Sequence, residues 1–203
     1  MKLHNPKTKK FSQLERIMAV WIGCKRCSLH LHRRNQVFFR GNEHAKILLI
    51  GEGPGVDEDE QGYPFVGRAG KVLDKALKAA NLEKDVGITN MVICRPPENR
   101  VPTNVEMTCC AERLMMVVET IHPAVLVLLG GTAAHRLCGI KQVCNWRGKE
   151  LLIEMTCSAI SNISRYKGLV TWHPSFYLHS GYNPVVFNQM VLDLKHAVKM
   201  SRG

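Results

Sequence analysis

A glycine-rich stretch between an apolar run and an amphipathic segment most constrains the fold of this chain. Residues 51–70 contain six glycines and two prolines, follow the apolar run at 47–50 and precede an amphipathic segment at 71–80. The pattern predicts a long loop at the carboxyl end of a β-strand, where open α/β sheets hold their ligands. The loop is acidic, and no Lys-Ser or Lys-Thr pair follows its glycines, so it does not match a phosphate-binding loop.

Further apolar runs alternate with helical patterns along the chain. After the strand near 46–51, strands are expected at 88–93, 124–130, 151–155 and 169–172, and helices at 14–22, 71–80, from Thr103-x-x-Glu106 onward, at 133–138 and at 183–199. A loop is expected between His173 and the last helix. Strands that alternate with helices predict an α/β protein, a three-layer α/β/α sandwich around a mainly parallel central sheet.

The size and charge of the chain limit its organisation and its partners. With 203 residues and 45% hydrophobic residues, one well-cored domain is expected at 12–203, behind a basic, mobile arm at 1–11. The net charge of +11 favours a nucleic acid as partner. Neither a run of ~20 apolar residues nor a secretory signal is present, so we expect a soluble, cytoplasmic monomer without a membrane partner.

The cysteines predict either buried thiols or a metal site. Eight cysteines in an intracellular protein argue against a disulfide framework. Cys24 and Cys27 form a Cys-x-x-Cys knuckle, whose two thiols point the same way around a tight turn. Such a pair needs further ligands from elsewhere in the chain to close a metal site.

Five motifs follow one another in the sequence and together point to a known family. They are Cys24-x-x-Cys27, the loop at 51–70, Thr89-Asn90 ahead of Cys94-Arg95-Pro96-Pro97-x-Asn99-Arg100, Cys110, and His173-Pro174-Ser175. In this order they resemble the family 4 uracil-DNA glycosylases, the iron–sulfur branch of the uracil-DNA glycosylase superfamily. The resemblance covers residues 14 to 199.

The resemblance implies a monofunctional glycosylase of base excision repair. Such an enzyme hydrolyses the N-glycosidic bond of a deoxyuridine that has flipped out of single- or double-stranded DNA, and it leaves an abasic site. Two alternatives stay open: a glycosylase for a 5-modified uracil, and a catalytically silent DNA-binding accessory factor on the same fold. Gly55 stands where the best-known branch of the superfamily has a tyrosine that excludes a 5-methyl group, so the pocket could admit modified uracils.

The resemblance also implies a structural [4Fe-4S] cluster on Cys24, Cys27, Cys94 and Cys110, because such a cluster requires four thiolates. The residues alone would equally allow Zn²⁺ on the same four sulfurs. Cys109 is a competing candidate for the fourth ligand because it is adjacent to Cys110. The spacing of sixteen residues after Cys94 that the family shows selects Cys110.

The family positions imply a substrate pocket for a single base. Asn90 would read the uracil edge, Phe65 would stack on the ring, and His173 would donate a hydrogen bond to uracil O2. The backbone of Gly53 and Pro54 would line the base.

Other positions of the family suggest roles around this pocket. Glu52 would orient or deprotonate the attacking water, and Glu58 would share that work or shape the pocket. Asn99 resembles another active-site position, whereas Asp57 and Asp59 are expected to be solvated loop charges.

DNA contacts are expected from two groups of residues. Arg68, Arg95 and Arg100 lie in the matched motifs near the pocket. The segment with Tyr177, Leu178 and His179, which follows His173, would press into the minor groove, although the family commonly has an arginine where His179 stands.

Overall fold

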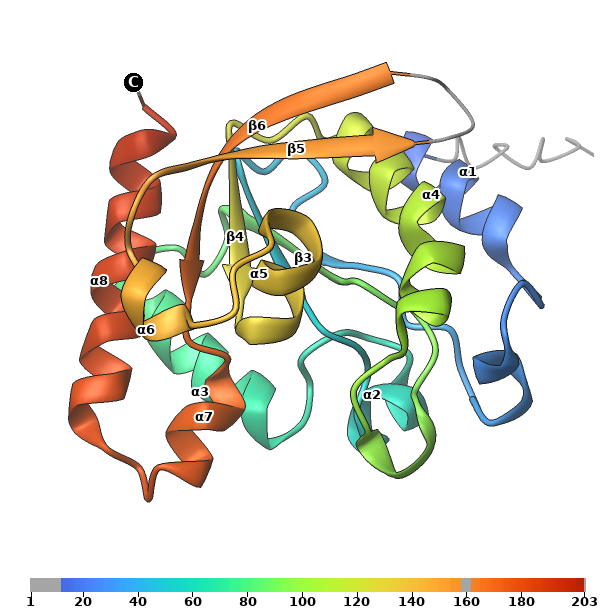
Figure 1. Ribbon diagram of the computed structural model, residues 1–203, viewed down its shortest axis with the longest axis horizontal. Coiled ribbons are helices and arrows are strands. Elements are labelled where there is room, and N and C mark those ends of the chain that lie inside the picture. The colour runs from blue at the N-terminus through green and yellow to red at the C-terminus, as the bar shows by residue number, and fades with distance from the viewer. Residues whose placement is uncertain (1–11, 158–161, 203) are drawn as a thin grey trace, which may run out of the picture.

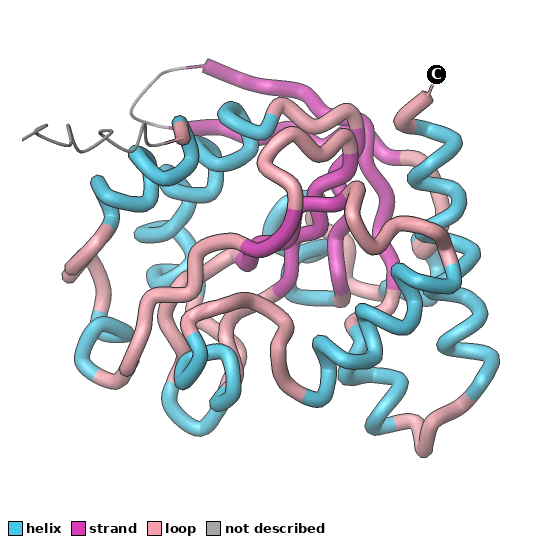
Figure 2. The backbone as a smooth tube through the Cα atoms, turned by 180° about the vertical axis from the view of Figure 1, so that it is seen from behind, coloured by secondary structure: helices cyan, strands magenta, loops and turns pink. Residues whose placement is uncertain are grey.

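A central β-sheet lies between two layers of helices in the computed structural model, which describes residues 12–157 and 162–202 (Figures 1 and 2). The strands are β1 Arg40–Gly41, β2 Ile47–Gly51, β3 Val86–Asn90, β4 Val125–Leu129, β5 Leu151–Cys157 and β6 Asn162–Thr171. The helices are α1 Gln13–Trp21, α2 Val56–Gln61, α3 Arg68–Ala79, α4 Asn104–Ile121, α5 Gly131–Cys138, α6 Val143–Trp146, α7 Pro174–His179 and α8 Pro184–Met200, with 3₁₀ turns η1 Ser28–Leu31 and η2 Pro97–Asn99.

The sheet is parallel in its centre and antiparallel at its edges. The strand order is β1-β3-β2-β4-β6-β5, and β3, β2, β4 and β6 run parallel to one another. The edge strands β1 and β5 pair antiparallel with β3 and β6. This topology confirms the predicted α/β class and brings the carboxyl ends of four strands to one edge of the sheet.

Side chains alternate between the two faces along each inner strand. In β2, Leu48 and Ile50 pack toward α1, α4 and α5, whereas Ile47 and Leu49 pack toward α3 and α8. Figure 2 shows the same arrangement from behind, with helices on both sides of the strands. Both faces of β2 and β4 are buried, which explains their uninterrupted apolar runs. The predicted three-layer sandwich is therefore confirmed.

Two helices begin at capping boxes, one at Ser12 and one at the predicted Thr103-x-x-Glu106. The Ser12 hydroxyl accepts a hydrogen bond from the Glu15 backbone N–H (3.0 Å) at the start of α1. At the start of α4, the Thr103 hydroxyl accepts from the Glu106 N–H (3.3 Å). Each cap satisfies N–H groups that lack partners within the helix, and typically contributes about 1 kcal/mol.

Some local predictions were wrong. The strand expected at 88–93 occupies Val86–Asn90 instead, because residues 91–94 leave the sheet and are buried in the core beside it. The loop at 51–70 contains the short helix α2, and the loop expected after His173 begins with α7.

Asp59 also departs from the prediction of a solvated charge. Its side chain is 2% exposed, and its carboxylate accepts hydrogen bonds from the backbone N–H groups of Arg34 (2.9 and 3.0 Å) and Asn35 (3.1 Å). Asp59 therefore fixes α2 to the segment that precedes β1, whereas Asp57 is exposed as predicted.

The predicted basic arm at 1–11 lies outside the described residues. Within the described residues, none of the helices combines the length and the hydropathy that crossing a bilayer would require.

Candidate active site

A cavity of about 280 Å³ opens at the carboxyl edge of the sheet. Its walls come from three segments that are far apart in sequence: the loop between β2 and α3, the loop between β3 and α4, and α7. In Figure 1 these segments lie together along the lower side of the molecule. The lining includes nine residues predicted for the site: Glu52, Gly53, Pro54, Glu58, Phe65, Asn99, Arg100, His173 and His179.

Phe65 forms one wall of the cavity and is held in a strained backbone conformation. Its φ is 56°, in the left-handed region that residues other than glycine rarely adopt. Gly70 packs directly on the Phe65 backbone, since a Cβ at Gly70 would lie 1.8 Å from the Phe65 carbonyl oxygen. This close approach requires glycine and fixes the direction of the Phe65 ring.

Asn90 lies next to this ring, at the end of β3. A Cβ built on Gly51 would lie 2.4 Å from Asn90 Oδ1 and 2.6 Å from Phe65 Cζ, so the amide and the ring meet beside the same glycine. The Asn90 side chain is 1% exposed and is not part of the cavity wall, so it lies deeper than the ring. Its Oδ1 has no hydrogen-bond partner among the described residues, which costs about 1–3 kcal/mol unless a ligand supplies a donor.

His173 faces the cavity from the N-cap of α7. Its ring centroid lies 5.8 Å from that of Phe65. Nδ1 accepts a hydrogen bond from the Ser175 backbone N–H (3.2 Å) and lies 2.7 Å from Ser175 Oγ, so the ring proton is assigned to Nε2. Burial, and then the neighbouring His179, lower the pKa of His173 to about 4. At neutral pH, His173 is therefore a neutral donor through Nε2.

Gly130, after β4, sets the position of this histidine. A Cβ at Gly130 would lie 2.6 Å from His173 Cβ, and the φ of Gly130 is 89°. Both observations require glycine there.

Glu52 follows β2 and presents a carboxylate to the cavity. The hydroxyl of Thr132, in the first turn of α5, donates a hydrogen bond to Glu52 Oε2. Both side chains are partly buried. No local pattern in the sequence singled out Thr132, because it lies 80 residues from its partner.

Glu58 uses both carboxylate oxygens to hold the loop. Oε2 accepts from the Gly55 N–H (3.0 Å), and Oε1 accepts from the N–H groups of Val66 (2.9 Å) and Gly67 (2.8 Å). These bonds join the start of α2 to the residues after Phe65. Their pattern favours the second of the two roles predicted for Glu58, that of shaping the pocket.

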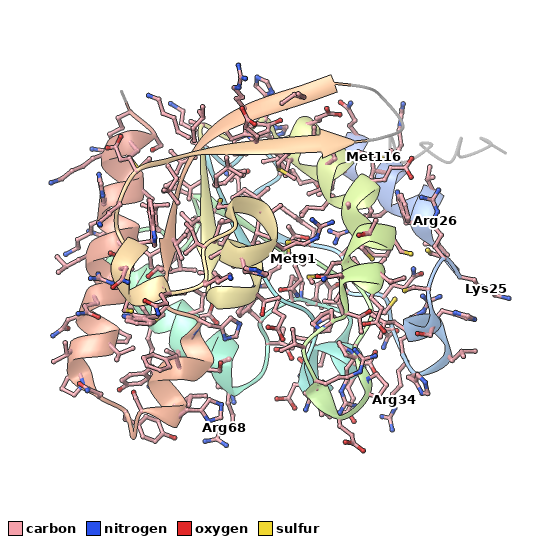
Figure 3. The ribbon with its side chains drawn as sticks, in the orientation of Figure 1. Lys25, Arg26, Arg34, Arg68, Met91 and Met116 are labelled. Carbon is pink, nitrogen blue, oxygen red and sulfur yellow. The ribbon has the colours of Figure 1, made fainter. Side chains whose placement is uncertain are left out.

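The three arginines predicted to contact DNA differ in how strongly their side chains are held by other residues. Arg100 forms a two-pronged ion pair with Glu106 (2.7 and 2.8 Å), which lowers the pKa of Glu106 to about 2. Arg95 donates from Nε to Asn99 Oδ1 (2.8 Å). Arg68 is exposed beside α7, where it reaches the Tyr182 hydroxyl (3.3 Å; Figure 3).

The apolar residues of α7 also differ in exposure. Tyr177 and Leu178 are partly buried and pack against the core cluster beneath α3 and α8, whereas His179 is exposed on the cavity rim. Phe176 and Tyr182 are 42% and 54% exposed, and sequence reasoning did not single them out.

The four cysteines predicted as ligands border one core cluster. Cys94 and Cys110 are buried within it, and Cys24 and Cys27 pack against it half-buried. Burial raises the pKa of Cys94 to about 11, although Arg33 donates a hydrogen bond (3.0 Å) to its Sγ; charges on Cys110 and Cys27 would raise it further. Cys27, Cys94 and Cys110 are therefore close enough to influence one another electrostatically.

The thiols are not already arranged as a metal site. Within residues 12–157 and 162–202, no three His, Cys, Asp or Glu side chains surround a common point as ligands would. Cys109 donates a hydrogen bond from Sγ to the Arg26 carbonyl (3.3 Å), inside the Cys24–Cys27 turn. Figure 3 shows Lys25 and Arg26 in this turn, beyond the end of α1.

The parallel sheet with a small cavity at its carboxyl edge is the arrangement of an α/β enzyme that binds a compact ligand. Residues 38–195 match the family model of the uracil DNA glycosylase superfamily, and the chain belongs to this superfamily. The family resemblance predicted from the motifs is thus confirmed.

Three curated proteins illustrate the similarity. The chain is 39% identical to a type-4 uracil-DNA glycosylase of Thermotoga maritima over 161 residues, which cover 79% of this chain and 80% of that protein. A type-4 enzyme of Archaeoglobus fulgidus is 46% identical over 122 residues, 60% of this chain and 61% of that protein. One of Saccharolobus solfataricus is 37% identical over 167 residues, 80% and 74% of the two chains.

Proposed function

We propose that this chain is a monofunctional uracil-DNA glycosylase of DNA repair. It would hydrolyse the bond between deoxyribose C1′ and uracil N1 and leave an abasic site. Membership of the superfamily and the names of the relatives support the activity. The single observation that carries the assignment to this site is the buried Asn90 Oδ1 beside the Phe65 ring, for which the described residues supply no hydrogen-bond donor.

The Asn90 amide explains how uracil would be selected. Its carbonyl oxygen would accept the N3–H of uracil while its NH₂ donates to O4. Cytosine presents the opposite pattern at both positions, so binding it would leave buried polar groups unpaired. The strained Phe65 would stack on the flipped base, which is typically worth ~1–3 kcal/mol per base. Gly53 and Pro54 would line the base through their backbone.

His173 would stabilise the leaving uracil. When the glycosidic bond breaks, the sugar becomes cationic and uracil leaves as an anion whose charge lies partly on O2. A neutral imidazole that donates from Nε2 stabilises such an anion as charge develops, without a proton having to be lost first. The low pKa of His173 and its bonds to Ser175 support this role.

Glu52 would act on the water molecule that attacks the sugar. Its carboxylate lines the same cavity and could orient or deprotonate the attacking water, and its charge would also stabilise the cationic sugar. Glu58, with three backbone N–H groups on its carboxylate, would keep the loop in shape. Asn99, held by Arg95, would complete the wall.

The cysteines fit a [4Fe-4S] cluster by the chemistry of their donors. Cys24, Cys27, Cys94 and Cys110 supply the four sulfurs that a cluster requires, and all four border one region of the core. Zn²⁺ on the same sulfurs is the alternative. When bound, the metal centre would supply a rigid link between the end of α1, the loop before η2 and α4, and would take no part in the hydrolysis.

The DNA would lie across the cavity mouth, in single- or double-stranded form. Arg68 and His179 are exposed at the rim and could contact phosphates. Arg95 and Arg100 would act mainly through the loop they hold. Tyr177 and Leu178 of α7 would press into the minor groove, as predicted from the sequence.

A uracil-release assay with matched asparagine variants tests the proposal. Wild type should release uracil from an oligonucleotide that contains deoxyuridine, and Asn90→Ala should reduce the single-turnover rate by about a hundredfold or more. Asn145→Ala is the control, because Asn145 is exposed on α6 and bonds only within that segment. An inactive wild type that still binds DNA would favour the accessory factor.

A second substrate in the same assay addresses specificity. Gly55 lines the cavity without a side chain, so an oligonucleotide with 5-hydroxymethyluracil tests whether 5-modified uracils are admitted. Faster release of the modified base than of uracil would replace the proposed substrate.

A further inference from the structure

Arg113 on α4 is a fully buried cation. Its side chain is 0% exposed, and it is among the largest fully buried side chains of the described residues. Nη1 donates to Thr89 Oγ1 (3.0 Å), and Nη2 donates to the backbone carbonyls of Asn90 (2.6 Å) and Met91 (2.9 Å). The guanidinium therefore clamps the end of β3. In Figure 3, Met91 lies well inside the molecule, between α4 and α5.

No carboxylate within the described part of the chain compensates the charge of Arg113. Among the described residues no ion pair includes Arg113, and its Nε has no hydrogen-bond partner. A guanidinium stays protonated in proteins, and a buried charge without a counter-charge is strongly unfavourable. The acidic groups whose charge would act on it are the thiols of Cys110 and Cys94.

Four metal-bound thiolates would supply the missing negative charge. Metal ligation deprotonates cysteine, and a centre with four thiolates is anionic overall. Cys110 lies one helical turn before Arg113 on α4, and Cys94 lies four residues after Asn90. The same arginine thus contacts the residue proposed to read the base and lies beside two of the proposed ligands.

We propose that Arg113 is a positioning residue that provides the counter-charge of the thiolate centre and, through its three hydrogen bonds, fixes the strand end from which Asn90 reads uracil. The inference rests on the proposed function and adds a connection between the thiolate centre and the base pocket, which the function itself does not require. Loss of the metal would leave Arg113 uncompensated and would loosen the base pocket. Loss of Arg113 would weaken both the metal centre and uracil recognition.

Two substitutions separate the charge from the hydrogen-bond geometry. Arg113→Lys keeps a cation, but its single, shorter-reaching ammonium cannot reproduce the fork in which Nη1 and Nη2 donate to separate acceptors, and Arg113→Met removes both the charge and the donors while it keeps an unbranched side chain. Arg136→Met is the control, because Arg136 also bonds to α4, through Thr108 (3.1 Å), but is exposed.

Three quantities would be measured on proteins purified without oxygen. They are the metal content per chain with its rate of release to a chelator, the inhibition constant of free uracil, and the affinity for undamaged DNA. For Arg113→Lys we expect metal release close to wild type and uracil inhibition weakened about tenfold. For Arg113→Met we expect faster metal release as well. The affinity of both Arg113 variants for undamaged DNA should stay within about twofold of wild type. The Arg136→Met control should match wild type within about twofold in all three quantities.

The measured metal release and uracil inhibition decide whether Arg113 has this role. Unchanged metal release and unchanged uracil inhibition in both variants would overturn it, as would an equal loss of uracil inhibition and DNA affinity, which indicates general unfolding. Should Arg113→Met fail to fold, Arg113→Lys alone decides, because only the proposed clamp predicts weaker uracil inhibition with the metal retained. If wild type is not inhibited by uracil and releases none, the proposed function fails, and the metal data still test the counter-charge.

Discussion

Removal of the Thr132 hydroxyl should slow base release without weakening DNA binding. Thr132 donates to one oxygen of the Glu52 carboxylate, and both side chains are partly buried. Hydrogen bonds to charged groups typically contribute about 1.5–3 kcal/mol. Partial exposure favours the lower half of this range, and about 1.5–2.2 kcal/mol corresponds to a change in rate of about ten- to fortyfold. We therefore expect a decrease of this size in Thr132→Val.

The assay is single-turnover uracil release at saturating enzyme, with DNA affinity measured in parallel. Thr132→Val keeps the shape of the side chain and lacks its hydroxyl, whereas Thr132→Ser keeps the hydroxyl and should retain most of the rate. If the valine variant stays within about twofold of wild type, or if serine and valine lose activity equally, the hydroxyl does not orient Glu52.

Other predictions concern acid stability, the metal and the pocket. Because the folded-state pKa of Glu106 lies below its ordinary value, the Glu106–Arg100 pair stabilises the protein above pH 4.5 and loses this contribution as the pH falls toward 2. Since Arg100 is half-exposed, we expect Glu106→Gln to lower the urea unfolding free energy by about 1–2 kcal/mol at pH 7 and by less at pH 4; an equal effect at both would contradict this. Cys110→Ser should lose bound iron while Cys109→Ser keeps it, as measured by iron analysis; the reverse result would exchange the two as ligands. Gly51→Ala should abolish uracil inhibition, because its methyl group would meet the Asn90 amide and the aromatic ring beside it, and an unchanged inhibition constant would refute this placement.

Features with a local signal in the sequence were predicted well. The apolar runs of β2 and β4 are uninterrupted because both faces of these strands are buried, and both capping boxes mark the start of a helix. Three of the five motifs that define the family lie in segments that line one cavity: the loop at 51–70, the segment from Cys94 to Arg100, and His173-Pro174-Ser175. These successes depend on patterns within about ten residues of chain.

Features that depend on distant partners were missed. Arg113 occupies a position on α4 whose burial no periodicity reveals, and its acceptors lie 22 to 24 residues away. The sequence around Asp59 is typical of a surface charge, and its burial depends on the backbone N–H of Arg34, which lies 25 residues away. The helix α7 was missed because it is only six residues long and begins with the His-Pro pair, which is also typical of a turn.

Three glycines near the cavity determine where this pocket can be redesigned. Gly130 allows no added methyl group, since His173 stands against it, and Gly70 allows none because the Phe65 carbonyl occupies the space. Gly55 differs, because the nearest atom to an added Cβ, at 2.7 Å, is a carboxylate oxygen of Glu58, so a substitution there would be accommodated by a shorter residue at position 58 and not by a shift of the backbone. Libraries that aim to alter which base is accepted should therefore vary Gly55 and leave the other two unchanged.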